Sequence, residues 1–301
     1  MSLLSFLSIK DVQDKFEQEF PLPKFNLKKE ILAPPLTNHY SLVGTAFDYL
    51  LRFYVKYINP QAITYAWVAE YAPQIFISLR GRLAIISKGD KVKIDMKKSV
   101  STLSKEDRKT FMKILAILIS AKKNYSVFLE NGKISDKLIK STLQLAQLDE
   151  IFRVGYVDEN LGMVDERDVE DLKNLISLVK PEDFKAKANK VCALNPTFGK
   201  GSKLVGGADA DILLDDTLID IKTTKKLELE RRTFNQLIGY YILFLIGGIN
   251  NCSTCEVKRL GVYFSRYREL YTFSVKDVVN ENKLPDFIEW FKERARKEFH
   301  P

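Results

Sequence analysis

The sequence has few of the residues on which several classes of protein depend. It contains three cysteines, Cys192, Cys252 and Cys255, and two histidines, His39 and His300, among 301 residues. Three thiols are too few, and odd in number, for a disulfide framework. A zinc or iron–sulfur site normally needs four thiolates, so the C-x-x-C pair is interpreted as two loop cysteines without a metal.

Long apolar runs are also missing, and the first residues do not have the pattern of a secretory leader. The longest apolar stretches, near residues 111–121 and 237–249, fall short of the roughly 20 residues that a helix needs to span a bilayer. The N-terminus has no basic region before its apolar residues, and Asp11 and Asp14 follow early, which argues against a secretory signal. We therefore expect a soluble, cytoplasmic protein that does not act in a membrane.

Basic charge is what the chain has in excess. The formal net charge is +8 and the isoelectric point is near 9.1, in a composition that is 46% hydrophobic and 29% charged. Such a chain can bury a substantial core in one or two domains. Its positive charge favours a polyanionic partner, because lysines and arginines that neutralise phosphates gain affinity through counterion release.

The most informative stretch, residues 205–226, reads VGGADADILLDDTLIDIKTTKK. Two apolar runs flank Asp215-Asp216, a pattern typical of a β-hairpin with a two-residue turn. In such a hairpin, the two residue numbers of each facing pair add up to the same value. The predicted pairs are Leu213 with Leu218, Asp211 with Asp220, and Asp209 with Lys222, and strand alternation places all six on one face.

Two opposed carboxylates need an explanation, because like charges directly across a sheet destabilise it. A divalent metal held by Asp211 and Asp220 would compensate them, with Lys222 beside it. The alternative is a solvated hairpin face whose charges have no role. The opposite face carries Ile212, Leu214, Ile219 and Ile221, which favours a sheet with one face on a core and one polar face that carries the chemistry.

At this point the chain resembles a known family. Asp211 followed by Asp-x-Lys at residues 220–222 resembles the active site of the PD-(D/E)XK nuclease superfamily. DIKTT is similar to the DYKT-type signature of its RecB-like branch, with Ile221 in place of Tyr. Gln236 and Tyr240 match the Q-x-x-x-Y helix motif of that branch.

The resemblance, which covers mainly residues 191–270, implies a nuclease that uses Mg²⁺ or Mn²⁺ to hydrolyse phosphodiester bonds, with DNA favoured over RNA. It implies that Asp211, Asp220 and the Ile221 backbone carbonyl hold the metal. Lys222 would position the attacking water or stabilise developing charge. Gln236 and Tyr240 would orient the substrate strand or the lysine. A catalytically inactive nucleic-acid-binding protein of the same fold is the alternative.

A further metal ligand is suggested near the N-terminus. In the RecB-like branch the first core helix carries a G-x-x-x-H pattern, and Gly44 and Asp48 stand at that spacing, with Asp in place of His. A carboxylate is also a ligand for hard metals, so the resemblance adds Asp48 to the metal site. The competing interpretation is an exposed or paired helix carboxylate, and Glu70 is the rival acidic residue of this region.

Periodicity gives the expected fold. Helices are predicted near 41–57, from 104 onward, at 135–152, 165–179, 230–245 and 285–299, and strands at 190–194, 210–214, 217–221, 259–265 and 269–275. This order predicts an α/β (α+β) protein. The resemblance implies a restriction-endonuclease-like core (αβββαβ) with a large helical insertion. We expect an N-terminal arm with the first core helix at 1–60, a helical subdomain at 61–185 and a nuclease core at 186–301.

Overall fold

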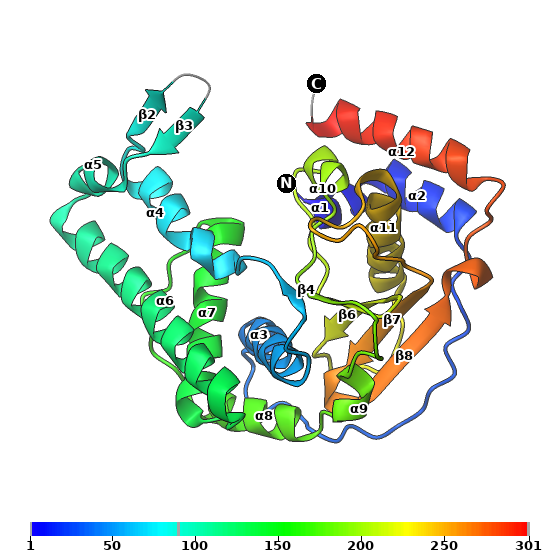
Figure 1. Cartoon of the computed structure of the whole chain (residues 1–301), viewed down its shortest axis with the longest axis horizontal. Coiled ribbons are helices and arrows are strands. Elements are labelled where there is room, and N and C mark those ends of the chain that lie inside the picture. Colours follow the sequence, from blue (N-terminus) through cyan, green and yellow to red (C-terminus); the bar gives the residue numbers. More distant parts are fainter. Residues whose placement is uncertain (1, 89–90, 300–301) are drawn as a thin grey trace. The chain divides into compact units, whose positions relative to one another are not determined.

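The chain forms two compact units in the computed structural model, which describes residues 2–88 and 91–299 (Figure 1). The sheet unit consists of Met1–Pro34, Ile58–Tyr65 and Leu178–Pro301. The helical unit consists of Pro35–Tyr57 and Ala66–Ser177. The three segments predicted from the sequence, 1–60, 61–185 and 186–301, divide the chain differently, because the first 34 residues pack with the C-terminal half while the helix that follows them packs with the middle of the chain.

A mixed sheet organises the sheet unit, which confirms the α/β class. Its strands, in spatial order, are β1 (Ile63–Thr64), β4 (Cys192–Leu194), β5 (Ile212–Leu214), β6 (Thr217–Lys222), β7 (Arg259–Phe264) and β8 (Glu269–Ser274). The pairs β4–β5, β5–β6 and β7–β8 are antiparallel, whereas β1–β4 and β6–β7 are parallel. Parallel neighbours need a crossover connection, and α11 (Arg231–Gly247) provides it between β6 and β7.

The register predicted for the hairpin is confirmed. Leu213 pairs with Leu218, and the neighbouring pairs Ile212–Ile219 and Leu214–Thr217 follow the same constant sum. The expected polar face is not found, because Leu213 and Leu218 are as fully buried as Ile212 and Ile219 on the other face. The charged residues therefore lie at one end of a strand pair that is buried on both faces, and Asp220 is itself only 2% exposed.

The N-terminal segment is helical rather than an irregular arm. It forms α1 (Leu3–Leu7) and α2 (Lys10–Glu19), and the rings of Phe6 and Phe16 contact Phe291 and Phe287 of the C-terminal helix α12 (Leu284–Phe299) edge to face, with centroids 5.1 and 5.2 Å apart. These contacts place the N-terminus in the main hydrophobic core. Edge-to-face aromatic pairs add to the gain from burial, so two short helices are stable here.

Two further local predictions from the sequence need correction. Residues 200–204, for which neither a helix nor a strand was predicted, form the helix α10 (Lys200–Leu204), where the Gly201 backbone packs so closely on Leu243 that a Cβ would clash. The loop cysteines Cys252 and Cys255 are joined by a disulfide, with Cα atoms 5.6 Å apart. That separation lies in the normal range for a disulfide, so a tight turn suffices to close the bridge. Cys192 is free and buried.

The helical unit contains the predicted long helices. Its elements are α3 (Tyr40–Ile58), α4 (Ala72–Arg80), α5 (Met96–Ser101), α6 (Lys105–Asn131), α7 (Asp136–Val154), α8 (Glu166–Ser177) and the hairpin β2 (Ile85–Lys88) and β3 (Lys91–Ile94). The hydroxyls of Ser104 and Ser135 accept hydrogen bonds from the third residue of α6 and α7, at 3.0 and 3.3 Å. These N-caps fix where the helices start.

Short elements complete the two units. They are α9 (Pro181–Phe184) and the 3₁₀ turns η1 (Val68–Tyr71), η2 (Ser265–Tyr267) and η3 (Val275–Asp277). Across the described ranges 2–88 and 91–299, no helix combines the length and apolar character needed to cross a membrane.

Candidate active site

The hairpin β5–β6 brings together the acidic residues that the sequence singled out. Asp211 precedes β5 directly, and by the observed register it faces Asp220 of β6. The turn between the strands begins at Asp215, whose φ of 57° is in the left-handed region that Asp tolerates better than most residues. This tight turn holds the register, and the register sets the two carboxylates opposite each other.

Asp211 is held by main-chain hydrogen bonds. Its Oδ2 accepts a hydrogen bond of 2.6 Å from the Ile221 backbone N–H, and its backbone carbonyl accepts one of 2.8 Å from Asn195. In an extended strand the N–H and the C=O of one residue point to the same edge. The Ile221 carbonyl is thus directed to the same edge as the Asp211 carboxylate.

Lys222 lies against the second carboxylate. Its Nζ is 2.7 Å from Oδ2 of Asp220 and donates a hydrogen bond of 3.1 Å to Oε1 of Gln236 on α11. Burial opposes the charged form of this lysine, but the charge and hydrogen bond of Asp220 and the charge of Asp211 outweigh burial, so the pKa of Lys222 lies above its usual value. Lys222 is therefore an ammonium at neutral pH, fixed between a strand carboxylate and a helix amide.

A hydrogen-bonded chain continues along α11. The amide nitrogen of Gln236 donates a 2.7 Å hydrogen bond to the Tyr240 hydroxyl. Burial, reinforced by the charges of Asp220, Asp211 and Asp209, raises the pKa of Tyr240 well above its usual value. The tyrosine is neutral at all physiological pH values, and its ring stacks on Phe198 with centroids 5.7 Å apart.

Gln236 and Tyr240 are both buried, at 8% and 6% exposure. One helical turn separates them, which places them on one face of α11. Since Gln236 bonds to Lys222 and Tyr240 bonds to Gln236, this pair orients the lysine. Orientation of a substrate strand by direct contact with Tyr240, the other role expected from the sequence, does not fit so buried a side chain.

The two remaining candidate ligands, Asp48 and Glu70, belong to the helical unit and pair with basic side chains there. Both oxygens of Asp48 accept hydrogen bonds from Arg52 one turn later, with Arg52 Nε 2.9 Å from Asp48 Oδ1. Glu70 forms an ion pair with Lys122 at 3.0 Å. The structure thus brings five predicted site residues together within the sheet unit: Asp211, Asp220, Lys222, Gln236 and Tyr240. Asp48 and Glu70 instead form ion pairs with the side chains of Arg52 and Lys122 in the helical unit.

The donor set at the hairpin suits a hard divalent cation. Two carboxylates, of Asp211 and Asp220, lie on neighbouring strands with the Ile221 carbonyl on the same edge. Mg²⁺ is commonly bound through only one or two carboxylates and keeps several waters. No group of three or more His, Cys, Asp or Glu side chains that could hold a metal occurs in the part of the chain that the structure describes. An ion here would accordingly take most of its ligands from water or substrate.

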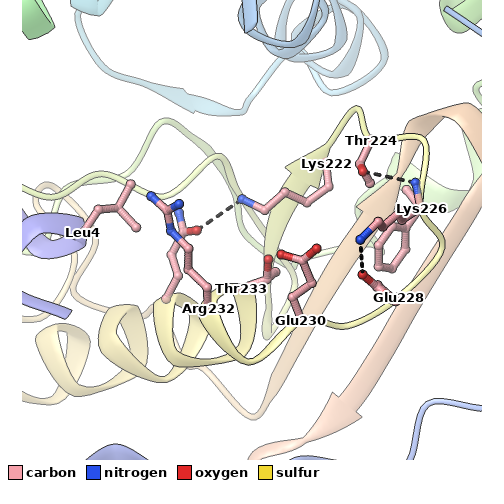
Figure 2. A pocket seen from close by; sticks show the side chains of 10 residues that line it. Leu4, Lys222, Thr224, Lys226, Glu228, Glu230, Arg232 and Thr233 are labelled. Atoms are coloured by element: carbon pink, nitrogen blue, oxygen red, sulfur yellow. Dashed lines mark hydrogen bonds and ion pairs between the residues drawn. The ribbon is translucent and has the colours of Figure 1, made fainter. Parts of the chain in front are cut away.

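A pocket of about 250 Å³ opens beside Lys222 (Figure 2). Lys222, Lys226 and Arg232 contribute cations to its lining, Glu228 and Glu230 contribute carboxylates, and Thr224 and Thr233 contribute hydroxyls. Figure 2 shows the Lys222 ammonium and the Arg232 guanidinium directed toward the same part of this pocket. The pocket therefore gives a ligand from solvent access to Lys222 and Gln236, whereas Asp211 and Asp220 are not among its lining residues.

Arg232 was not among the site residues predicted from the sequence. A signal was nevertheless present, since Arg232, Gln236 and Tyr240 are spaced four residues apart and so share one face of α11. Its neighbour Arg231 has a structural role, because it donates a 2.8 Å hydrogen bond to the Phe20 carbonyl and lies over the Phe234 ring.

Comparison of the chain with protein-family models, with characterised proteins and with solved structures finds no match.

Proposed function

We propose that the protein is a metal-dependent nuclease that hydrolyses phosphodiester bonds, with DNA favoured over RNA as the substrate. One observation carries the proposal. Asp211, Asp220 and Lys222 meet at the end of a buried hairpin, and Gln236 of the crossover helix holds the lysine. The order Asp, then Asp-x-Lys, then Gln-x-x-x-Tyr resembles the PD-(D/E)XK superfamily, and the strand sequence β4, β5, β6, α11, β7 is compatible with the restriction-endonuclease-like core expected for that superfamily.

Each residue has a role that its surroundings support. Asp211 and Asp220, with the Ile221 carbonyl, would hold Mg²⁺ or Mn²⁺, which when bound lowers the pKa of water and offsets charge on the phosphate. Lys222 stays protonated and supplies a fixed positive charge where the transition state becomes more anionic. Gln236 holds the Lys222 ammonium in place, and Tyr240 holds Gln236.

A second candidate is a nucleic-acid-binding protein of the same fold without catalysis. It is favoured by the ion pair between Lys222 and Asp220, which already neutralises one carboxylate without a metal. It is favoured also by the small number of protein ligands at the hairpin. Both candidates predict nucleic-acid binding, but only the first predicts cleavage.

The deciding experiment is a cleavage assay with and without Mn²⁺ on labelled linear and circular substrates, single- and double-stranded DNA and RNA. We expect cleavage that requires Mn²⁺ and is lost in Asp220→Asn. Asp216→Asn is the matched control, because it makes the same chemical change at the turn of the same hairpin. Absence of cleavage of every substrate, or equal cleavage by the parent and Asp220→Asn, would overturn the nuclease proposal.

A further inference from the structure

A second pocket lies next to the one beside Lys222. It has a volume of about 580 Å³ and is lined by four lysines, Lys28, Lys29, Lys225 and Lys226, by one carboxylate, Glu30, and by Tyr267 and two leucines. Lys226 lines both pockets, so the two are neighbours on the surface of the sheet unit. We call the side chains of Lys28, Lys225, Lys226 and Arg232 the basic track.

The chain holds the basic track in place through its backbone. The Tyr267 hydroxyl donates a hydrogen bond to the Lys225 carbonyl, and the Lys226 N–H donates one of 3.2 Å to the Thr224 hydroxyl. Arg232 stands in the first turn of α11. The side chains of Lys225, Lys226 and Arg232 therefore extend from backbone that is held by hydrogen bonds or by a helix.

Several charges of this surface are already neutralised within the protein. Lys222 is paired with Asp220, Lys29 with Glu269, and Lys226 with Glu228 at 3.4 Å. Arg232 and Lys28 differ, since both are exposed and neither forms an ion pair or a side-chain hydrogen bond with a residue in the described ranges. An exposed guanidinium without an ion-pair partner can bind a phosphate through two parallel hydrogen bonds.

We infer that the basic track binds the phosphates of a nucleic-acid strand on one side of the bond that is cleaved. This inference rests on the proposed function, because it takes the hairpin carboxylates as the point of cleavage. The pocket beside Lys222 leads through Lys226 to Lys225 and Lys28, which is a route for successive phosphates rather than for one isolated anion. Contacts to phosphate position a strand without reading its sequence, so the track confers affinity and not base preference.

Binding measured without cleavage tests the track. A fluorescein-labelled single-stranded DNA and an RNA of the same sequence are titrated with the full-length protein in EDTA, and affinity is followed by anisotropy at several salt concentrations. Lys28→Gln with Arg232→Gln should weaken binding on the order of tenfold near 0.1 M salt, and should reduce the slope of log affinity against log salt by about 1.4 for two lost contacts on a single strand. Lys28→Gln alone should give a smaller change in the same direction.

The matched control is Lys276→Gln with Lys283→Gln, two exposed lysines that line neither pocket. It removes the same charge and should change affinity less than twofold. Equal weakening by the two double variants, no weakening by either, or competition by an oligo-aspartate as effective as competition by an oligonucleotide of equal charge would overturn the inference. Cleavage that does not depend on the track would reject the track and keep the nuclease. Track-dependent binding without cleavage of any substrate would keep phosphate binding by the track, but would reject the nuclease and with it the position of the track beside a cleaved bond.

Discussion

The ammonium of Lys222 lies 2.7 Å from Oδ2 of Asp220, two residues earlier on the same strand. The sequence placed Asp220 opposite Asp211 and so raised the question of what offsets their repulsion. Within the protein itself the answer is Lys222, assisted by the Ile221 amide that binds Asp211 at 2.6 Å. The metal-free hairpin is therefore not strained by two uncompensated charges, and this changes what substitutions at the site should do.

Replacing Lys222 by Met removes the internal cation but keeps much of the side chain's apolar volume. We expect cleavage to be lost, because no fixed positive charge remains at the phosphate. We expect Mn²⁺ to bind at least as tightly as to the parent, because Asp211 and Asp220 stay and no ammonium competes with the ion. Calorimetric titration with Mn²⁺ beside the cleavage assay checks both statements. Loss of Mn²⁺ binding in Lys222→Met would show that the lysine helps to build the metal site.

Replacing Asp220 by Asn should have the opposite effect on the metal. The variant should lose both Mn²⁺ binding and cleavage, since one of two carboxylate ligands is gone. Its metal-free form should also be less stable than the parent by about 1–3 kcal/mol, because the partly buried Lys222 ammonium loses its carboxylate partner. Urea unfolding in EDTA measures this loss, with Asp216→Asn as the control that should unfold like the parent. An Asp220→Asn protein as stable as the parent would mean that the ion pair contributes nothing to stability.

Gln236 links Lys222 to α11, so replacing Gln236 should affect both cleavage and stability. Gln236→Ala should lower cleavage and also destabilise the protein by about 1–3 kcal/mol, because buried hydrogen-bonding partners are left unsatisfied. Tyr240→Phe keeps the stacking on Phe198 and should reduce cleavage less. Melting temperatures and turnover of both variants are compared with Gln18→Ala, an exposed site. Unchanged turnover in Gln236→Ala would assign this residue to structure alone.

The sequence predicted the hairpin well because a short-range rule governs it. A two-residue turn at Asp215-Asp216 fixes the register of the two strands, so that only one pairing of their residues is possible. The observed Leu213–Leu218 pair follows that register. The same holds for Gln236 and Tyr240, which one helical turn brings to the same face. Local geometry was sufficient for these parts of the candidate site.

Most of the parts that could not be predicted depend on contacts between residues that are distant in sequence. The packing of Phe6 and Phe16 on α12 joins the two ends of the chain, and no local pattern specifies such a pairing. The ion pair of Asp48 with Arg52 is local, but the spacing also matched a ligand motif, and spacing alone does not determine which partner a carboxylate takes. Burial of both faces of the hairpin likewise depends on what other segments pack on it.

The disulfide between Cys252 and Cys255 leads to a prediction about redox state. Because it closes a very short loop, removing it should cost no more than about 2 kcal/mol of stability, and it lies in a loop outside the hairpin. Cys252→Ser with Cys255→Ser should therefore keep parental cleavage, with a small drop in melting temperature that a reducing agent reproduces in the parent. Both proteins should be colourless. Absorbance near 400 nm in the parent would indicate an iron–sulfur site and contradict the disulfide.

Asp149 in α7 is a buried carboxylate whose ionisation should influence stability. It is 3% exposed, accepts a 2.6 Å hydrogen bond from the Tyr49 hydroxyl and lies 3.7 Å from Arg153. Burial raises the pKa of Asp149 from 3.8 to about 6, even though Tyr49, Arg153 and Arg52 act in the opposite direction. The folded protein therefore binds a proton at this site at pH values where the unfolded chain has released it.

The sign of the pH dependence follows from this difference. The contribution of Asp149 to stability is fully present below pH 3.8, is lost as pH rises toward about 6 and is constant above that. A shift from 3.8 to about 6 corresponds to about 3 kcal/mol. Asp149→Asn keeps an acceptor for Tyr49 and cannot ionise, so its stability relative to the parent should rise by up to that amount between pH 4 and pH 6 and then stay level. Urea unfolding at several pH values tests this, with Glu150→Gln on the same helix as the control. A difference between Asp149→Asn and the parent that does not change with pH would show that Asp149 does not take up this proton in the folded state.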